Sequence, residues 1–271
     1  MAADLRDALG WSLPFRDNDL DREVVAALAA ADALEQDTDG LCKSRYRVSS
    51  VGEDLFLHSA YPTQAEDAVF FGPDSYRFAA LLRRELANLP PRREGRLVDI
   101  GAGAGVGAIV AAKLCPHLRT TMTDINPKAL FLASVNARAA GVEADFVLGE
   151  GLAGVTEPID LAIANPPYIV DDAGRDYRDG GDMHGGEVAL QMAEAAVERL
   201  ARTGRMILYT GGSIVAGRDP LHDALRQLAD GAGCDLRYDE IDPDVFGEEL
   251  TKPAYHDVER IAVVAAVLAR R

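Results

Sequence analysis

A glycine-rich turn between a buried strand and a buried helix constrains this chain more than any other feature. Residues 97–100 form a short apolar run around Asp99, and the apolar stretch 106–114 follows after only five residues. Three of those five are Gly101, Gly103 and Gly105, which let the backbone turn sharply and approach a ligand closely. Amide groups at the start of the helix lie beside the turn. The pattern predicts a strand, a tight turn and a helix, with a ligand site at the turn.

Short apolar runs that predict strands alternate with helical patterns along the rest of the chain. A second strand is expected at 120–124, and Asn126-Pro127 is typical of the start of a helix that ends before Gly141. Alternation of this kind favours a parallel sheet with helices on both faces, so the fold class is predicted as α/β. Further strands are expected at 145–148, 160–164, 206–209, 236–241 and 261–268, with helices at 186–203 and 219–230.

The N-terminal region has a different pattern. Apolar residues from Val24 to Leu34 recur at helical spacing, and Asp19 and Asp21 are candidate caps for that helix. Two strand-like runs at 44–51 and 55–61 flank Gly52-Glu53-Asp54. Glycine and aspartate at that spacing predict a β-hairpin with a short loop.

The join between this region and the rest of the chain is expected near residue 70. A helix is expected to begin near 71–74 and to run through Leu86, and Pro90-Pro91 should end it. The chain is therefore divided into two units. Residues 1–70 are predicted to form an N-terminal appendage, which is a candidate for substrate recognition, and residues 71–271 a catalytic domain.

The chain is acidic, and the acidity is uneven. Its 271 residues include 28 Lys and Arg against 44 Asp and Glu, a net charge of −16. The first 40 residues hold ten acids and three arginines. This charge argues against a protein that binds nucleic acid by bulk electrostatics, and it suits a basic protein segment as partner.

Several other classes of protein are excluded by what the sequence lacks. Cys42, Cys115 and Cys234 are too few and too far apart for a disulfide framework or a cysteine zinc cluster. The start of the chain lacks the basic and apolar regions of a signal peptide, and the longest apolar run, 261–269, is too short to cross a bilayer. The prediction is a cytoplasmic protein without a membrane partner. No metal site is predicted, because metal-ligand spacing is missing among His58, His117, His184, His222 and His256.

Two classes of ligand are consistent with the glycine turn. Gly103-x-Gly105-x-x-Ala108 satisfies the dinucleotide pattern, and Asp124 follows at the distance expected of an acid that binds ribose hydroxyls. The second class is S-adenosylmethionine. Asp99 favours it, because a carboxylate at this position suits the cationic end of S-adenosylmethionine better than it suits a pyrophosphate. Read from Asp99, Asp-x-Gly-x-Gly-x-Gly resembles the loop of Rossmann-like methyltransferases that bind S-adenosylmethionine.

A second motif points to the chemistry. The strand at 160–164 runs directly into Asn165-Pro166-Pro167-Tyr168, at the edge of a parallel sheet where ligands bind. The two prolines hold Asn165 in an extended conformation and rigidify the exit from the strand. The Asn165 carboxamide and the Pro166 carbonyl then present two acceptors that suit a planar –NH2 group. Tyr168 is expected to form an apolar wall or to stack on that group.

Together the two motifs resemble those of class I methyltransferases that modify planar nitrogens, and they are most similar to the release-factor glutamine methyltransferases. The resemblance covers about 71–271 and includes 149–152 and the Gly-rich stretch 180–187. It implies a Rossmann-like seven-stranded methyltransferase fold whose last strand, at 261–268, is antiparallel. It also implies a protein glutamine amide as acceptor, catalytic residues Asn165, Pro166, Pro167 and Tyr168, and cofactor-binding residues Asp99, Gly101, Ala102, Gly103, Gly105, Asp124, Ile125, Glu150 and Asn165.

Departures from the family leave the acceptor open. Where bacterial release-factor enzymes carry Pro-Arg-Pro-Glu-Thr, this chain has residues 70–75, and its adenine-side acid is Glu150 rather than Asp. The alternatives are an exocyclic amine of RNA or DNA, a small metabolite, a nicotinamide oxidoreductase, or a non-catalytic binding module. A nucleic acid would have to be held by the few candidate phosphate contacts: Lys43, Arg45, Arg47 and Arg92-Arg93.

Other polar and aromatic residues are assigned no catalytic role. His184 is interpreted as a loop residue near the substrate, and Asp171-Asp172 as part of a solvated loop. The aromatics Phe70, Phe71 and Tyr76 could line the adenosine or substrate pocket, but packing beside the start of a helix is the preferred interpretation.

Overall fold

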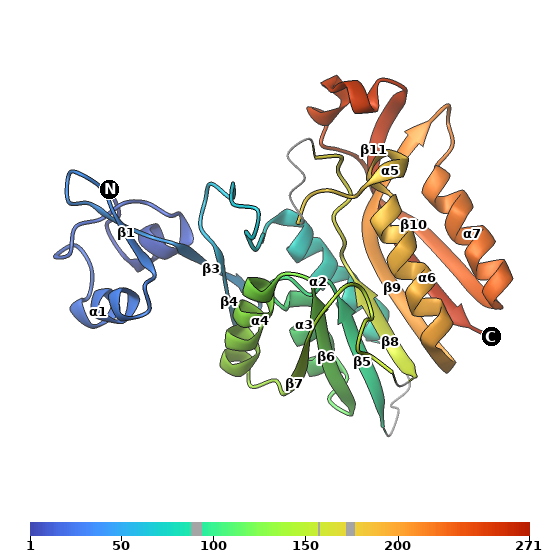
Figure 1. The fold of residues 1–271 in the computed structure, drawn as a ribbon, viewed down its shortest axis with the longest axis horizontal. Helices are drawn as coiled ribbons and strands as arrows, with labels where there is room; N and C mark the ends of the chain where they lie inside the picture. The colour runs from blue at the N-terminus through green and yellow to red at the C-terminus, as the bar shows by residue number, and fades with distance from the viewer. Residues whose placement is uncertain (88–93, 157, 172–176) are drawn as a thin grey trace.

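The computed structural model describes residues 1–87, 94–156, 158–171 and 177–271. Its described part contains a seven-stranded sheet in the order β10-β11-β9-β8-β5-β6-β7 (Figure 1). The strands are β5 (Gly95–Ile100), β6 (Leu118–Asp124), β7 (Ala144–Leu148), β8 (Ile159–Ala164), β9 (Leu200–Val215), β10 (Cys234–Val245) and β11 (Val258–Arg270).

The central pairs are parallel, and β11 is antiparallel to both of its neighbours. This confirms the predicted α/β class, the seven strands and the antiparallel last strand. The carboxyl ends of β5, β6 and β8 therefore meet at one edge of the sheet. In an open α/β fold this is the edge at which ligands bind.

Helices cover both faces of the sheet because its strands are apolar on both sides (Figure 1). In β8, Leu161 and Ile163 face one core, whereas Ala162 and Ala164 face the other. The first core packs under α2 (Pro73–Leu86), α3 (Val106–Leu114) and α4 (Pro127–Ala140), and the second packs under α6 (Glu187–Arg199) and α7 (Pro220–Ala232). The buried middle of the sheet thus holds the strand ends rigidly beneath the site.

Helix boundaries follow local signals in the sequence. The Asn126 side chain accepts hydrogen bonds from the backbone of Lys128 and Ala129, and Gly141 ends α4 in the left-handed conformation at φ 69°. The predicted limits of α4 are confirmed. Helix α2 ends at Leu86, and Pro90-Pro91 lie outside the described residues.

The sequence underestimated the C-terminal strands. Strand β9 runs from Leu200 to Val215 rather than over 206–209, and the predicted helix at 186–203 ends at Arg199. Gly211 and Gly212 interrupt the apolar pattern, but both pair with β11, so the backbone ladder continues where the side-chain signal stops. Strands β10 and β11 are also longer than predicted, because their pairing continues through polar residues such as Asp235, Asp242 and Arg270.

The N-terminal region begins with a small subdomain of its own. A five-residue π-helix (Arg6–Gly10), α1 (Arg22–Ala30), β1 (Leu34–Gln36) and β2 (Cys42–Ser44) surround a minor core that includes Phe15. Asp21 caps α1, as predicted, by accepting the N–H groups of Glu23 and Val24. The helix is shorter than expected, because the chain turns after Ala30 and Leu34 pairs with Ser44 in the small sheet.

The predicted hairpin is confirmed as β3 (Tyr46–Val51) and β4 (Asp54–Ser59), joined at Gly52-Glu53. Phe56 of β4 belongs to the main core, and β4 packs against α4. The boundary at residue 70 stays a prediction. The structure adds that the hairpin, which precedes residue 70, shares a hydrophobic core with the seven-stranded sheet, which follows residue 70.

Asn136 of α4 joins the hairpin to the glycine turn. It is buried, and its side chain accepts the N–H of Leu57 at 2.7 Å while donating to the carbonyls of Leu57 at 3.0 Å and Ala104 at 2.9 Å. Three backbone groups therefore depend on one carboxamide.

We expect Asn136→Ala to lower the free energy of unfolding by about 2–3 kcal/mol, since it leaves buried backbone groups without partners. Urea denaturation measures this. The control is Ser134→Ala on the same helix, whose hydroxyl donates only to the carbonyl of Phe131, and it should cost less than about 0.5 kcal/mol. Equal losses in the two variants would contradict the role of Asn136.

Among the described residues, no helix has both the length and the apolar character needed to cross a membrane. The same part of the chain contains no group of three or more His, Cys, Asp or Glu side chains arranged to hold a metal ion.

Candidate active site

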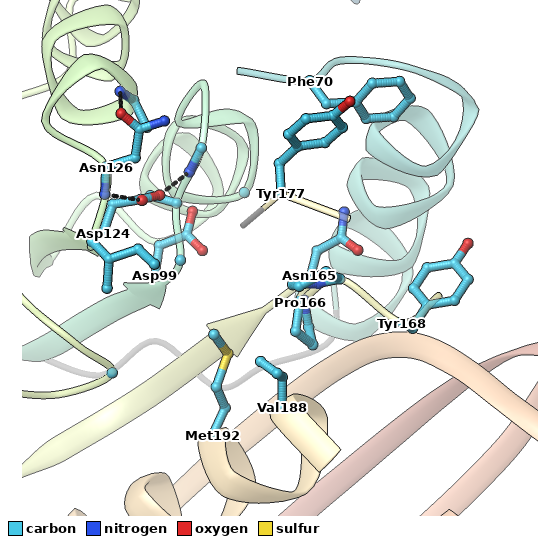
Figure 2. Close-up of a pocket in the computed structure, with 18 of the residues that line it drawn as sticks. Phe70, Asp99, Asp124, Asn126, Asn165, Pro166, Tyr168, Tyr177, Val188 and Met192 are labelled. Atoms are coloured by element: carbon cyan, nitrogen blue, oxygen red, sulfur yellow. Dashed lines mark hydrogen bonds between the residues drawn. The ribbon is translucent and has the colours of Figure 1, made fainter. Parts of the chain in front are cut away.

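A cavity of about 770 Å³ opens at the edge of the sheet where β5, β6 and β8 end. The wall is completed by the start of α2, by α6 and by residues from 68 to 70. Figure 2 shows Asp99 and Asp124 on one side of this cavity, Asn165 and Pro166 across from them, and Val188 and Met192 of α6 forming a further wall.

The structure brings together nearly all of the predicted site residues. The cavity is lined by Asp99, Gly101, Ala102, Gly103, Asp124, Ile125, Glu150, Asn165, Pro166, Pro167 and Tyr168. They come from turns that are up to 69 positions apart in the chain, and the parallel pairing of β5, β6 and β8 places these turns side by side.

Gly105 is the exception among the predicted cofactor residues. It is not part of the cavity lining, and it caps α3 with a left-handed φ of 79°. A Cβ at this position would lie 3.2 Å from the Cβ of Ala133 and 3.3 Å from the Sδ of Met122. The backbone conformation and the packing against α4 therefore by themselves require a glycine here, and its contact with a cofactor stays a prediction.

Backbone hydrogen bonds define the glycine turn. The N–H of Ala102 donates to the carbonyl of Thr123 at 2.9 Å, and the N–H of Gly105 donates back to the carbonyl of Ala102 at 2.8 Å. The turn is thus tied to the end of β6. As a result, the backbone of residues 101–103 faces the cavity.

Asp124 links the glycine turn to the start of α4. One carboxylate oxygen accepts the N–H of Gly103 at 2.8 Å, and the other accepts the N–H of Asn126 at 2.9 Å (Figure 2). The carboxylate is held between the glycine turn and the start of α4, at the cavity wall. A carboxylate fixed in this way is well placed to accept hydrogen bonds from a ribose diol.

Asp99 lies beneath the turn and is 2% exposed. Its carboxylate accepts the N–H of Ala108, in the first turn of α3, at 2.7 Å. Burial raises the pKa of Asp99 to about 7, against the lowering effect of that hydrogen bond. A cationic ligand at this end of the cavity would be stabilised by the ionised form.

Tyr168 has a more buried position than the sequence predicted. Its ring packs on Gly211 of β9, where a Cβ would collide with it, and it meets the ring of Phe246 at 5.8 Å between centroids. Burial and the charge of Asp74 raise the pKa of Tyr168. The ring lines the cavity while its hydroxyl is buried, and its role as a wall for the acceptor stays a prediction.

Some lining residues were not predicted. Phe70 was expected to pack, yet it lines the cavity and stacks on Tyr177 at 6.1 Å between centroids and 13° between planes (Figure 2). The Tyr177 hydroxyl donates to the carbonyl of Thr63 at 2.6 Å. The pair of adjacent aromatics at 70–71 was the available signal. Phe71 is buried, as expected, and Tyr76 is exposed and lies outside the lining.

Two further interpretations are revised by the structure. Asp171 is not solvated: it is buried and lies 3.5 Å from the guanidinium of Arg178, whereas Asp172 is outside the described residues. His184 does not line the cavity. Its ring contacts the carboxylate of Asp257 at 2.9 Å.

Comparison with known proteins identifies the family. Residues 79–228, more than half of the chain, match the model of the methyltransferase small domain. The chain belongs to this family. The fold is accordingly the Rossmann-like methyltransferase fold.

The chain is 32% identical over 173 residues to the release factor glutamine methyltransferase of Deinococcus radiodurans. The alignment covers 62% of this chain and 61% of that relative. It is 30% identical over 129 residues to the ribosomal RNA small subunit methyltransferase C of Serratia proteamaculans, covering 48% of this chain and 32% of that one. The chain therefore spans less than two thirds of the length of either relative.

Solved structures share the fold at low sequence identity. The SAM-dependent methyltransferase from Agrobacterium tumefaciens aligns with a TM-score of 0.56 at 16% identity, covering 84% of this chain and 70% of that one. The M. jannaschii TYW2 in complex with AdoMet aligns with a TM-score of 0.54 at 16% identity, and the alignment covers 88% of this chain and 94% of that one.

The raised pKa of Asp99 makes stability dependent on pH. A carboxyl whose pKa is higher in the folded than in the unfolded protein stabilises the fold at low pH, and this contribution is lost as pH rises through about 7. We expect Asp99→Asn, which still accepts the Ala108 bond, to match the wild type near pH 4 and to become relatively more stable toward pH 7. The maximum slope is about 1.4 kcal/mol per pH unit.

Urea denaturation of the ligand-free protein between pH 4 and 8 measures this difference. Asp145→Asn, at the exposed edge strand β7, serves as the control and should follow the wild-type curve. A difference between Asp99→Asn and the wild type that does not change with pH would show that Asp99 is ionised throughout.

Proposed function

We propose that this protein is an S-adenosylmethionine-dependent methyltransferase whose acceptor is a planar nitrogen, the side-chain amide of a glutamine in a protein. The observation that carries the proposal is the position of Asn165-Pro166-Pro167-Tyr168. This motif leaves the carboxyl end of β8 and lines the same cavity as Asp99 and Asp124.

The residues on the cofactor side fit S-adenosylmethionine. Asp124, fixed from both sides, suits the ribose hydroxyls, and the half-exposed Ile125 offers an apolar surface to the adenine. Glu150 lines the same cavity and would accept a hydrogen bond from the adenine edge. Asp99 lines the same cavity, and the cationic end of a ligand would favour the ionised form of its carboxyl. When bound, the cofactor supplies an electrophilic methyl group on a sulfonium.

The acceptor side has the groups that an amide needs. The Asn165 carboxamide oxygen and the Pro166 carbonyl would each accept one hydrogen of the –NH2 group, which aims the nitrogen at the methyl carbon. An amide is a weak nucleophile, so orientation and electrostatics must supply most of the acceleration. The nitrogen–carbon bond forms as the sulfur–carbon bond breaks, and one N–H proton is released to solvent.

Charge in and around the cavity supports a protein acceptor over a nucleic acid. The lining cations already have partners: Arg178 pairs with Asp171 and Glu249, and Arg199 donates to backbone carbonyls. The lining acids are Asp74, Asp99, Asp124, Glu150 and Asp179. Such a surface repels a phosphate backbone.

The candidate phosphate contacts of the appendage also have partners. Lys43 donates to the carbonyl of Tyr61, Arg45 lies 3.8 Å from Asp32, and Arg47 donates to the carbonyl of Gly10. Arg92-Arg93 lie outside the described residues. An exocyclic amine of RNA is the second candidate acceptor, and it is favoured by the similarity to a ribosomal RNA methyltransferase.

Ligand specificity separates a methyltransferase from a nicotinamide oxidoreductase. We expect S-adenosylhomocysteine at a hundredfold excess over its Kd to stabilise the protein by about 2.7 kcal/mol, and NAD to have no effect. Thermal unfolding with each ligand measures this. Stabilisation by NAD alone would overturn the assignment of the cofactor.

Methyl transfer tests the acceptor. Incubation of the enzyme with radiolabelled S-adenosylmethionine and cell lysate should label material that protease destroys and nuclease does not. Label that only nuclease removes would favour the RNA acceptor.

We expect Asn165→Ala to lower the labelling rate by about 100-fold or more, because the acceptor nitrogen is no longer oriented. Its Kd for S-adenosylhomocysteine should stay within about twofold of the wild-type value. Full turnover in this variant would contradict the role of Asn165.

A further inference from the structure

The connection between β10 and β11 brings an aromatic residue to the acceptor end of the cavity. Strand β10 runs parallel to β8. It is antiparallel to β11, β11 is antiparallel to β9, and β9 is parallel to β8. Its carboxyl end therefore reaches the edge of the sheet that carries the site (Figure 1). Phe246 is the first residue beyond this end, and it lines the cavity.

The backbone at Phe246 is strained. Its φ is 55°, in the left-handed region that disfavours a bulky side chain. Strain of this kind persists only where the surroundings impose it, and it is concentrated at sites of function. Gly247 follows immediately, so the chain could have turned here with the glycine in the left-handed position.

Two ion pairs hold this turn from both sides. Four residues before it, Asp242 accepts from the Arg77 guanidinium of α2 at 2.8 Å. Three residues after it, the buried Glu249 accepts from Arg178 at 2.5 Å. Arg178 itself lines the cavity, so the turn is fastened directly to the segment that follows Tyr168.

The far part of the connection is fastened to the same segment. The Tyr255 hydroxyl, in a buried side chain, accepts the N–H of Val170 at 2.8 Å. The Asp257 carboxylate contacts His184 at 2.9 Å. The whole connection is thus docked onto residues that follow the Asn165-Pro166-Pro167-Tyr168 motif.

The geometry of the two rings indicates what they can contact. Phe246 and Tyr168 have centroids 5.8 Å apart and planes inclined at 65°. Rings at this angle and separation pack edge to face on each other. They form one continuous apolar corner, which suits the aliphatic stem of a glutamine side chain.

We propose that Phe246 is an acceptor-binding residue that packs against the aliphatic stem of the acceptor side chain. The inference rests on the proposed function. Asp242 and Glu249 are positioning residues that hold the ring in place through their ion pairs.

The test is the rate of radiolabelled methyl transfer to lysate protein as a function of lysate concentration. Phe246→Gly should raise the half-saturating lysate concentration by roughly tenfold, the scale of a lost apolar contact in a pocket. Its Kd for S-adenosylhomocysteine should stay unchanged. Its Tm, measured alongside, reports the balance between relief of the left-handed strain and loss of the ring's packing on the core.

Two more variants separate the ring from its support. Glu249→Gln should also raise the half-saturating concentration, with the maximal rate less affected, whereas a purely structural role would change Tm alone. Phe131→Ala, which removes an exposed aromatic of α4 outside the cavity, is the matched control and should leave transfer unchanged.

An unchanged half-saturating concentration in Phe246→Gly, with active wild-type enzyme, would overturn this proposal and leave the proposed function intact. Labelling of RNA in place of protein by the wild type would overturn both. A wild type that binds S-adenosylhomocysteine but labels nothing would also contradict both.

Discussion

The carboxylate of Asp124 is the interaction on which the cofactor side depends. It ends β6, accepts an N–H from the glycine turn after β5 and another from the start of α4, and so joins three elements at one point. Together with the bond from Asn136 of α4 to the carbonyl of Ala104, the carboxylate fixes the distance between the turn and the helix. Asp99 performs a similar task below, where its bond to Ala108 holds the first turn of α3 against the strand.

The acceptor side is built on a different principle. Here the motif after β8 is rigid by virtue of its prolines, but the groups that surround it come from distant segments. Arg77 pairs with Asp74 within α2, and Arg178 after the motif pairs with the buried Glu249 of the β10–β11 connection. Buried pairs contribute little net stability but penalise any arrangement that separates them. They therefore favour one arrangement of the aromatic side chains around Asn165.

Much of this molecule could be predicted from its sequence, and the misses have physical causes. Strands and helices of the catalytic region were predicted because strong apolar periodicity and end signals such as Asn126 and Gly141 are local. The length of β9 was missed because backbone pairing with β11 continues through glycines that carry no apolar signal. Gly105 was assigned to the ligand, whereas its neighbours Ala133 and Met122 come from elements that no local pattern relates to it.

The sequence by itself determined the fold class, the glycine turn after β5 and the Asn165-Pro166-Pro167-Tyr168 motif after β8, since each is written in consecutive residues whose backbone preferences are local. Only the tertiary structure decided which side chains complete the cavity. Phe70, Tyr177 and Phe246 lie far apart in the chain, and they meet because the parallel sheet brings its carboxyl ends to one edge and ion pairs fasten the connections above it. Contacts of this kind depend on the packing of whole elements, which no short stretch of sequence encodes.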